Sequence, residues 1–231
     1  MPIPESPLSS ESEELFVLPP FDMLELDERE HLVKKIRLHN FAADDILYAQ
    51  GQENVPLFFL CSGLIKLSCT ASQGRECVLH LIRPKSFVDA AVLFYEGGMP
   101  YSAIAINNGM LYALEKNVVL GLMHGNAAFS LRMMKLMAAR QRLFINKLVG
   151  SQGRISVTCR VSSWLLHRSR MEGTNILYID ISRELMARLL GVTRESMSRE
   201  LSRLAELGYI AMARRQITLL EKKALQRLAN M

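Results

Sequence analysis

The spacing of apolar residues changes twice along the chain of 231 residues. From Phe41 to about Lys116, short apolar runs are separated by turn residues such as Asn107-Asn108-Gly109, which is typical of many short antiparallel strands. From Asn126 to Val149 the apolar residues follow steps of three and four, which predicts one long helix. The rest of the chain mixes short helices with short strands. The pattern predicts an α+β protein with a small β-barrel or double-sheet roll, a long helix and a C-terminal domain.

The same pattern gives the expected domain limits. Residues 1–20 are rich in Pro, Ser and Glu and predict a flexible N-terminal arm, with local order from Glu14 to Leu18. The barrel domain is expected over residues 21–124 and the long helix over residues 125–150. After a hinge at residues 150–153, the C-terminal domain covers residues 151–231.

The most informative stretch is Ile181–Leu207, which reads as two short amphipathic helices separated by Gly191-Val192-Thr193. Ser182 can cap the first helix and Thr193 the second, because their hydroxyl oxygens can accept free backbone N–H groups. Gly191 supplies the left-handed conformation of a tight turn, and the small Ala187 lets the two helices cross closely. The stretch predicts a helix-turn-helix, with an ordinary solvated hairpin as the alternative.

Polar side chains at the start of the second predicted helix point away from its apolar face. Arg194, Glu195, Ser198 and Arg199 are spaced by one, three and four residues, so they occupy adjacent faces. Guanidinium groups suit guanine O6 and N7, and a carboxylate suits the cytosine amino group. We therefore predict a recognition helix that reads base edges in a DNA major groove.

Composition and charge support this interpretation. Residues 151–231 contain 14 Lys and Arg against 7 Asp and Glu, whereas residues 1–150 contain 14 against 16. The basic C-terminal third therefore suits phosphate binding. The acidic N-terminus resembles no secretory signal, and no apolar run reaches the ~20 residues of a membrane span, so we expect a cytoplasmic protein without a membrane partner.

The long predicted helix carries two apolar stripes instead of one. One stripe contains Phe129, Met133 and Leu136, and a second lies beside it. Two stripes suggest burial against the barrel on one side and against a partner helix on the other, with a single helix sunk into its own domain as the alternative. We therefore predict a dimerisation helix, whose partner-facing residues are Met134, Met137, Gln141, Phe144 and Leu148.

With these elements in place, the chain resembles the Crp/Fnr family of bacterial transcription regulators over roughly residues 20–225. The resemblance rests on GVTRESMSRELSRLAELGYI, on ILYAQGQENVPLFFLCSGLIKLSCTASQGRECVLHLIRPKSF and on the order of the domains. It implies an N-terminal double-stranded β-helix, which is a jelly-roll barrel like that of cyclic-nucleotide-binding domains, and a C-terminal winged helix-turn-helix. It also implies a homodimer that binds a double-stranded DNA operator and works with RNA polymerase.

The resemblance assigns roles to individual residues of the C-terminal domain. Glu195 and Arg199 match the family positions that read base edges, and Ser198 matches the E-x-x-S-R variant that goes with TTGA…TCAA half-sites. Arg194 is expected to be a further base contact. The expected DNA phosphate contacts are Ser182, Arg183, Thr193 and Arg203.

The predicted barrel departs from the cyclic-nucleotide binders of the family. Those proteins carry a Glu for the ribose hydroxyl and an Arg for the cyclic phosphate, whereas this chain has Asp89 or Ala90 at the first position and Tyr101 or Pro100 at the second. Since a buried phosphate without a guanidinium is costly, we do not expect cAMP as the effector. The effector is unknown, and its expected pocket contains Asp89, Tyr101, Ser102, Met133 and Met137.

The sequence also bears on metal or iron–sulfur binding, on a redox-active cysteine pair and on haem binding in the barrel. The four cysteines show no CxxC spacing and none precedes Cys61, so neither a metal site nor an iron–sulfur cluster is expected. Cys69 and Cys77 flank SQGRE symmetrically and could be a redox pair, or simply two small buried side chains. Haem is a further candidate, with Pro2, His80 and His124 as its candidate ligands.

We do not expect an enzyme, because His80 is the one histidine of residues 41–116, and catalytic barrels of this kind hold metals on His and Glu clusters. A DNA-binding protein with a purely structural barrel remains the alternative to an effector-controlled regulator.

Overall fold

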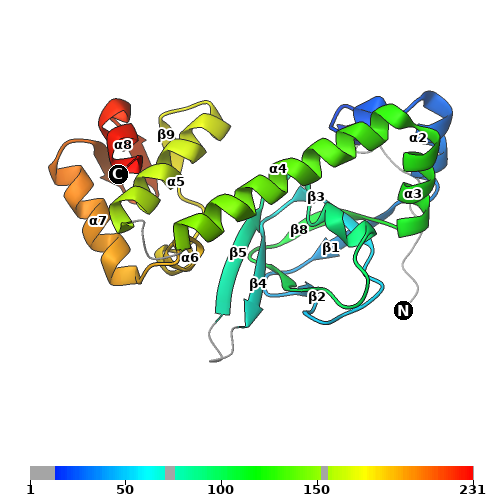
Figure 1. The fold of residues 1–231 in the computed structure, drawn as a ribbon, viewed down its shortest axis with the longest axis horizontal. Coiled ribbons are helices and arrows are strands. Elements are labelled where there is room, and N and C mark those ends of the chain that lie inside the picture. The colour runs from blue at the N-terminus through cyan, green and yellow to red at the C-terminus, as the bar shows by residue number, and fades with distance from the viewer. Residues whose placement is uncertain (1–13, 71–75, 152–155, 231) are drawn as a thin grey trace. The chain divides into compact units, whose positions relative to one another are not determined.

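The computed structural model describes residues 14–70, 76–151 and 156–230 (Figure 1). Among residues 143–151 of the long helix, side chains are described for Phe144 and Ile145. The chain divides into two compact units, Met1–Arg142 and Leu143–Met231, and each is described by itself. Of the predicted hinge at residues 150–153, residues 150 and 151 belong to the long helix, and residues 152 and 153 lie outside the described residues.

The barrel of the first unit consists of two four-stranded antiparallel sheets. The first sheet has the order β1-β8-β3-β6 and the second the order β2-β7-β4-β5, so each sheet combines strands from distant parts of the sequence. This double-sheet roll confirms the predicted barrel. Its strands are β1 (Arg37–Phe41), β2 (Ile46–Tyr48), β3 (Leu57–Ser62), β4 (Ile65–Thr70), β5 (Glu76–Ile82), β6 (Ser86–Phe87), β7 (Ser102–Ala105) and β8 (Gly109–Leu114).

Aromatic side chains form the centre of the core. The Phe59 ring makes edge-to-face contacts with Phe21 and Phe87 at centroid distances of 5.3 and 5.2 Å. Such pairs add to the stability that burial itself supplies. Phe21 belongs to a short 3-10 helix, η1 (Phe21–Met23), so the segment before the barrel contributes to the core.

The local order predicted from Glu14 to Leu18 is present within the N-terminal arm. Leu15 is buried in the same core, and residues 14–20 lead directly into η1 and α2 (Leu26–Val33). An apolar side chain therefore anchors this segment to the core. Residues 1–13, including Pro2, lie outside the described part.

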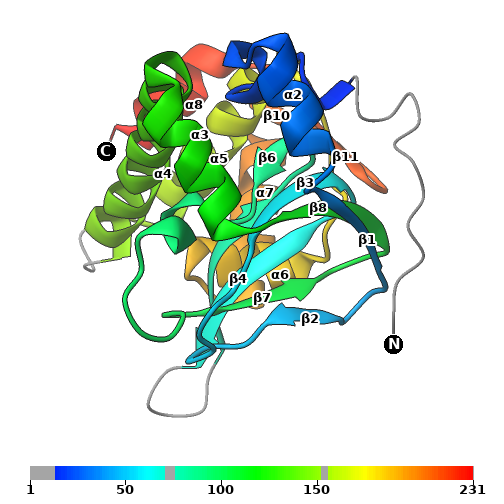
Figure 2. The same cartoon turned by 90° about the vertical axis from the view of Figure 1, so that its right-hand side faces the viewer.

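A helix that was not expected follows the last barrel strand. The strand pattern was predicted to end at about Lys116, and β8 ends at Leu114; α3 (Lys116–Gly125) follows after one residue, within the predicted barrel domain of residues 21–124. A second 3-10 helix, η2 (Ala90–Leu93), lies between β6 and β7. Figure 2 shows α3 next to α2, beside the strands of the roll. Asn126 joins these helices, since its side-chain amide donates to Glu28 Oε2 at 2.8 Å and to Met23 O at 3.0 Å.

The long helix is confirmed as α4 (Ala127–Ser151). Its first stripe packs on the barrel, where Phe129 and Met133 are fully buried. On the other side Met134 is 54% exposed and Leu131 is 51% exposed, so apolar side chains of this helix face solvent within the monomer.

The second unit is a three-helix core with a small antiparallel sheet of order β10-β11-β9. Helix α5 packs against α7 and α8, and the β10–β11 hairpin forms the predicted wing. The elements are α5 (Val157–Glu172), β9 (Ile176–Tyr178), α6 (Arg183–Leu190), α7 (Arg194–Glu206), β10 (Ile210–Ala213), β11 (Gln216–Leu219) and α8 (Lys222–Ala229). Within the described ranges, no helix has both the length and the apolar composition that a membrane crossing requires.

Candidate nucleic-acid interface

Helices α6 and α7 begin at the two predicted caps. Ser182 Oγ accepts the Leu185 N–H at 3.1 Å, and Thr193 Oγ1 accepts the Ser196 N–H at 3.1 Å. Each hydroxyl satisfies one of the N–H groups that a helix leaves without an intrahelical partner. The local sequence therefore sets where both helices of the motif start.

Gly191 ends α6 in the left-handed conformation, with φ of +63°. The turn is held by a hydrogen bond of 3.0 Å from Val192 N to Ala187 O. Arg160 of α5 also binds it, because its guanidinium donates to Leu190 O at 3.2 Å and to Gly191 O at 3.0 Å. The carbonyl groups at the end of α6 thus receive a charged donor from a neighbouring helix, which favours this turn geometry.

The apolar faces of the two helices meet as the spacing predicts. Met186 and Ala187 of α6 are buried against Met197, Leu201 and Leu204 of α7, and each of these five side chains is at most 2% exposed. This packing directs the opposite face of α7 outward.

The predicted base-reading residues lie on that outer face. Arg194, Glu195 and Arg199 are exposed, and Ser198 is half-buried. Arg183, at the start of α6, is exposed and donates a hydrogen bond of 3.2 Å from Nη1 to Ser198 Oγ. The structure therefore brings together one arginine expected to bind phosphate and the serine expected to read bases.

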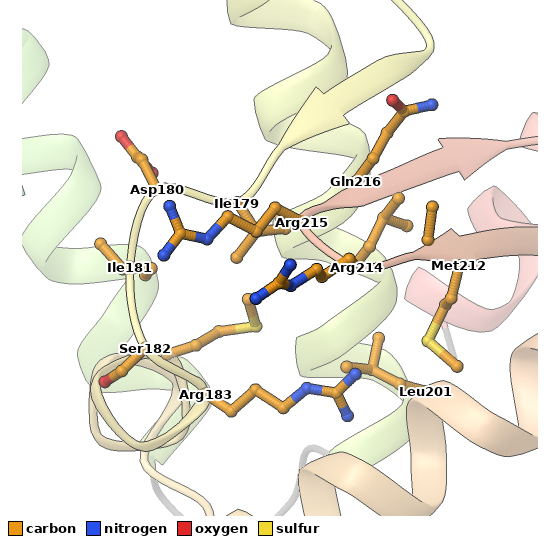
Figure 3. A pocket seen from close by; sticks show the side chains of 13 residues that line it. Ile179, Asp180, Ile181, Ser182, Arg183, Leu201, Met212, Arg214, Arg215 and Gln216 are labelled. Atoms are coloured by element: carbon orange, nitrogen blue, oxygen red, sulfur yellow. The ribbon is translucent and has the colours of Figure 1, made fainter.

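A groove of about 340 Å³ lies between the start of α6 and the wing (Figure 3). Its floor contains the apolar side chains of Met186, Leu201 and Ile217, and three arginines line it. Arg183 comes from α6, whereas Arg214 and Arg215 come from the turn between β10 and β11 (Figure 3). Three guanidinium groups around one opening suit the phosphate oxygens of a nucleic-acid backbone.

Two contacts fix the geometry of this groove. The Ile179 N–H donates to Arg215 O at 2.8 Å, which ties the wing turn to the segment before α6. Arg168 of α5 donates to Tyr178 O at 3.1 Å and to Asp180 Oδ1 at 3.4 Å. Because Arg168 is buried and fully engaged with these partners and with Glu172, it supports the segment that carries Ser182 and Arg183.

Arg214 and Arg215 were not among the predicted phosphate contacts. Their adjacency at the tip of a predicted hairpin was visible in the sequence. Only the fold shows that this tip lies beside Arg183, which is about thirty residues earlier.

Arg203, which was expected to contact phosphate, has a different arrangement in the structure. Its guanidinium donates to Glu200 Oε2 at 3.1 Å and to Glu200 Oε1 at 2.8 Å, and it also reaches Thr158 Oγ1 at 3.3 Å. The hydrogen bonds to Glu200 raise the pKa of Arg203. Since Glu200 is buried, the arginine is needed to neutralise its carboxylate. The structure thus shows Arg203 in an ion pair with Glu200 and the Thr193 hydroxyl in the helix cap described above, and their contacts with phosphate stay predictions.

The barrel contains a second polar cluster, centred on Asp89 and Tyr101. The Tyr101 hydroxyl donates to Asp89 Oδ2 at 2.5 Å, and Asp89 Oδ1 accepts the Ala91 N–H at 3.0 Å. Both side chains are buried. Asp89 and Tyr101, which are among the candidates for the positions of the Glu and Arg of the cyclic-nucleotide binders, are thus bonded to each other.

A buried arginine from α4 lies near this pair and was not predicted as a site residue. Arg140 donates to Val88 O at 2.7 Å and to Phe87 O at 2.9 Å, which are the two carbonyls directly before Asp89. Burial lowers the pKa of Arg140, while the charge of Asp89 opposes that effect. The hydroxyl of Tyr48 is buried without a hydrogen-bond partner near the same charges.

The remaining predicted pocket residues are Ser102, Met133 and Met137, whose described contacts lie within the barrel unit. The Ser102 hydroxyl accepts the Gln50 N–H at 2.9 Å, Met133 is fully buried in the core, and Met137 packs against the core. Their roles in the structure are those of strand pairing and packing.

The histidines proposed as haem ligands occupy different elements. His80 is half-buried on β5, whereas His124 is exposed near the end of α3, with Nδ1 2.7 Å from Leu120 O. Over residues 14–70, 76–151 and 156–230, no three His, Cys, Asp or Glu side chains form a group that could hold a metal ion.

Comparison with known proteins agrees with both halves of this description. The model of the cyclic nucleotide-binding domain matches residues 38–126, and that of the Crp-like helix-turn-helix domain matches residues 159–228. A CRP-like cAMP-activated global transcriptional regulator of Mycobacterium tuberculosis is 24% identical over 204 residues, which cover 86% of this chain and 91% of that protein.

The anaerobic regulatory protein of Bacillus subtilis is 25% identical over 197 residues, covering 83% of this chain and 80% of that protein. The structure of FixK2 from Bradyrhizobium japonicum superposes with a TM-score of 0.74 at 19% identity, over 84% of this chain and 96% of the other. The two domain models together match more than half of the chain, in the order that the fold shows. The chain is therefore a DNA-binding transcription regulator and not an enzyme, and it belongs to the Crp/Fnr family.

Proposed function

We propose that two copies of this chain bind a palindromic operator of the form TTGA-N6-TCAA. The observation that carries this proposal is the exposure of Arg194, Glu195 and Arg199 at the start of α7, on the face opposite the buried apolar residues. Arginine and glutamate at these positions match the acceptor and donor groups of G·C pairs in the major groove. Ser198 lies between them and is held by Arg183.

A homodimer is supported by the solvent-facing side of α4. Leu131 and Met134 are more than half exposed there, although the opposite side of the same helix is fully buried. A second copy of α4 would cover these apolar side chains by coiled-coil packing. Light scattering coupled to gel filtration should give twice the chain mass. Met134→Glu should shift the mass toward the monomer, and the exposed Lys135→Glu is the matched control.

Operator choice can be tested by fluorescence anisotropy with a TTGA-N6-TCAA duplex and duplexes changed at single half-site positions. We expect each change to weaken binding by ~1–3 kcal/mol. The Arg199→Ala variant should lose part of this discrimination, because it removes a base contact. Equal affinity of the wild type for the operator and for a scrambled duplex would overturn the operator assignment.

We further propose that a small effector other than cAMP acts on the cluster of Asp89, Tyr101 and Arg140. The Asp89–Tyr101 hydrogen bond supports the exclusion of cAMP, because cAMP at these positions would have to replace a bond that already satisfies both groups. A cyclic phosphate would face the Asp89 carboxylate, and the Arg140 donors already bind two backbone carbonyls. Any effector must bind one state of the protein more tightly than another to change DNA affinity.

Two measurements test the effector proposal. Calorimetric titration with cAMP should show no binding, and tight binding that is lost in Arg140→Ala would contradict the proposal. An absorption spectrum of the purified protein separates haem from a colourless effector, since bound haem gives an intense Soret band.

Transcription with purified RNA polymerase from a promoter that carries the operator would test polymerase as the partner and show whether the regulator activates or represses.

A further inference from the structure

Cys69 and Cys77 lie directly opposite each other in the roll. They belong to the antiparallel strands β4 and β5, and the register pairs Cys69 with Cys77, between the pairs Ser68–Val78 and Thr70–Glu76. None of the four cysteines of the chain is in a disulfide. The two cysteines, each four residues from Gln73 in the sequence, thus form a cross-strand pair.

The pairing places the two thiols within reach of a covalent bond. Residues directly opposite each other in an antiparallel pair have Cα atoms about 4.5 to 5.5 Å apart. A disulfide requires a Cα separation of about 4.4 to 6.8 Å. The strands therefore hold these cysteines at a suitable distance, and little backbone movement is needed to join them.

The two cysteines differ in their surroundings. Cys77 is exposed, whereas Cys69 is half-buried and packs against the barrel core. An exposed thiol next to a second, less accessible thiol is the arrangement of a redox-sensitive pair, since one reacts with the oxidant and the other resolves the product. The exposure of Cys77 also argues against the alternative that both residues are simply buried hydrophobic side chains.

The other two cysteines lie in different places. Cys61 is on β3, which belongs to the other sheet of the roll. Cys159 is buried in α5 of the second unit, where its Sγ donates to Ala229 O at 3.0 Å. They provide internal controls, because neither has a cysteine opposite it in a described strand pair.

We propose that Cys69 and Cys77 form a reversible disulfide when the protein meets hydrogen peroxide. The Cys77 thiolate attacks one peroxide oxygen, forming an S–O bond while the O–O bond breaks, and the released hydroxide leaves as water after protonation. The Cys69 thiolate then attacks the Cys77 sulfur, forming the S–S bond while the S–O bond breaks and a second water leaves. Two thiols are thereby oxidised to one disulfide, and one peroxide is reduced to two waters. A small dithiol reverses the reaction by thiol–disulfide exchange.

The disulfide would join β4 and β5 beside residues 71–75 and restrict the separation of the two strands at that end. This proposal concerns a modification of the barrel and does not depend on the operator or on the effector proposed above. Its test therefore measures the chemistry of the cysteines, and DNA affinity is a separate measurement on the same samples.

Peptide mapping gives a direct readout. The full-length protein is treated with hydrogen peroxide, alkylated without reductant and digested with trypsin, which cuts after Lys66, Arg75 and Lys85. We expect peptides 67–75 and 76–85 to be recovered as one disulfide-linked species, and as two alkylated peptides after reduction. We also expect Cys77 to react at least about tenfold faster than Cys159, because oxidation follows thiol accessibility.

Serine variants assign the two roles. Cys77→Ser should abolish the linked species, and Cys69→Ser should let a sulfenic acid accumulate at Cys77, where dimedone traps it. Cys61→Ser is the matched control and should leave the yield of the link unchanged. The proposal is overturned if the wild type, with the circular dichroism of folded protein, forms no linked species while Cys77 stays reduced or proceeds to sulfinic acid. A link from Cys77 to Cys61 in place of Cys69 would overturn it equally.

Discussion

Arg183, the first residue of α6, donates a hydrogen bond of 3.2 Å to Ser198 in the second turn of α7. The bond joins the residue at the edge of the arginine-lined groove to the face that carries Arg194, Glu195 and Arg199. Since a guanidinium has five N–H donors, one bond to Ser198 leaves others for a phosphate oxygen. In the proposed complex, contact with the DNA backbone and contact with the bases would therefore be coupled through one pair of side chains.

Arg199 and Arg183 occupy different positions, so their substitution should reduce DNA affinity in different ways. Arg199→Ala should cost ~1–3 kcal/mol on the operator and relax sequence choice, because a base contact is lost. Arg183→Ala should weaken binding to operator and scrambled duplexes by similar factors and reduce the slope of log affinity against log salt by about one. Anisotropy titrations at several salt concentrations measure both effects. If Arg183→Ala lowered affinity for the operator alone, its assignment to phosphate would be wrong.

The wing arginines provide a second test of the groove. Replacing Arg214 and Arg215 together with alanine should reduce the salt slope by about two, because two phosphate contacts are removed. The matched control is the double substitution of Lys223 and Arg227 on α8, which removes the same charge from exposed positions outside the groove. An equal reduction of the salt slope in the two double variants would mean that overall charge, and not the groove, determines DNA binding.

Substitution of Arg203 tests whether this residue contacts DNA or stabilises the fold through an ion pair. Its bonds to the buried Glu200 predict that Arg203→Ala lowers the free energy of unfolding by about 1–3 kcal/mol, because it leaves a buried carboxylate without its charged partner. The affinity of the folded variant for DNA should change little. Urea unfolding and anisotropy on the same preparation measure the two quantities. A large loss of affinity at unchanged stability would restore Arg203 as a phosphate contact.

The tyrosines of the barrel predict a loss of stability at alkaline pH. Burial, reinforced by the charge of Asp89, raises the pKa of Tyr48 and Tyr101 above the ordinary value of 10.0. Above about pH 10 the unfolded chain therefore loses protons that the folded chain keeps, and stability falls by up to ~1.4 kcal/mol per pH unit for each tyrosine. Tyr101→Phe should remove one of these contributions. It should also lower stability at neutral pH, since the buried Asp89 loses a hydrogen-bond donor.

Urea unfolding at several pH values between 8 and 12 measures this dependence, with tyrosinate absorbance as a second readout. The matched control is Tyr178→Phe, an exposed tyrosine on β9. If the free energy of unfolding fell with pH as steeply in Tyr101→Phe as in the wild type, Tyr101 would ionise without unfolding of the protein.

The helix-turn-helix was predictable because its determinants are local. Ser182, Gly191 and Thr193 each act on backbone groups within a few residues, and the apolar spacing of α6 and α7 specifies their common face. The pairing of Cys69 with Cys77 was predictable for a similar reason, since the two residues are equally far from Gln73 in the sequence.

Contacts between distant segments were not predictable in this way. Arg140 reaches the Phe87 and Val88 carbonyls, more than fifty residues earlier, and no local pattern marks that contact. Helix α3 was missed because its apolar run from Val118 to Met123 does not distinguish a short helix from a strand. The ion pair of Arg203 with Glu200 was not predicted, because an arginine three residues after a glutamate suits an ion pair on a helix and a phosphate contact equally well.

The groove of Arg183, Arg214 and Arg215 also bears on how the protein finds its operator. Phosphates repeat along every duplex, so in the proposed complex these arginines would hold the domain on any sequence while the outer face of α7 tests the base edges beneath it. Search along the duplex would then proceed by sliding and hopping, at a rate set by ionic strength. Under this proposal, the rate of arrival at the operator depends on the arginines of the groove, and the time spent there depends on the base-reading face of α7.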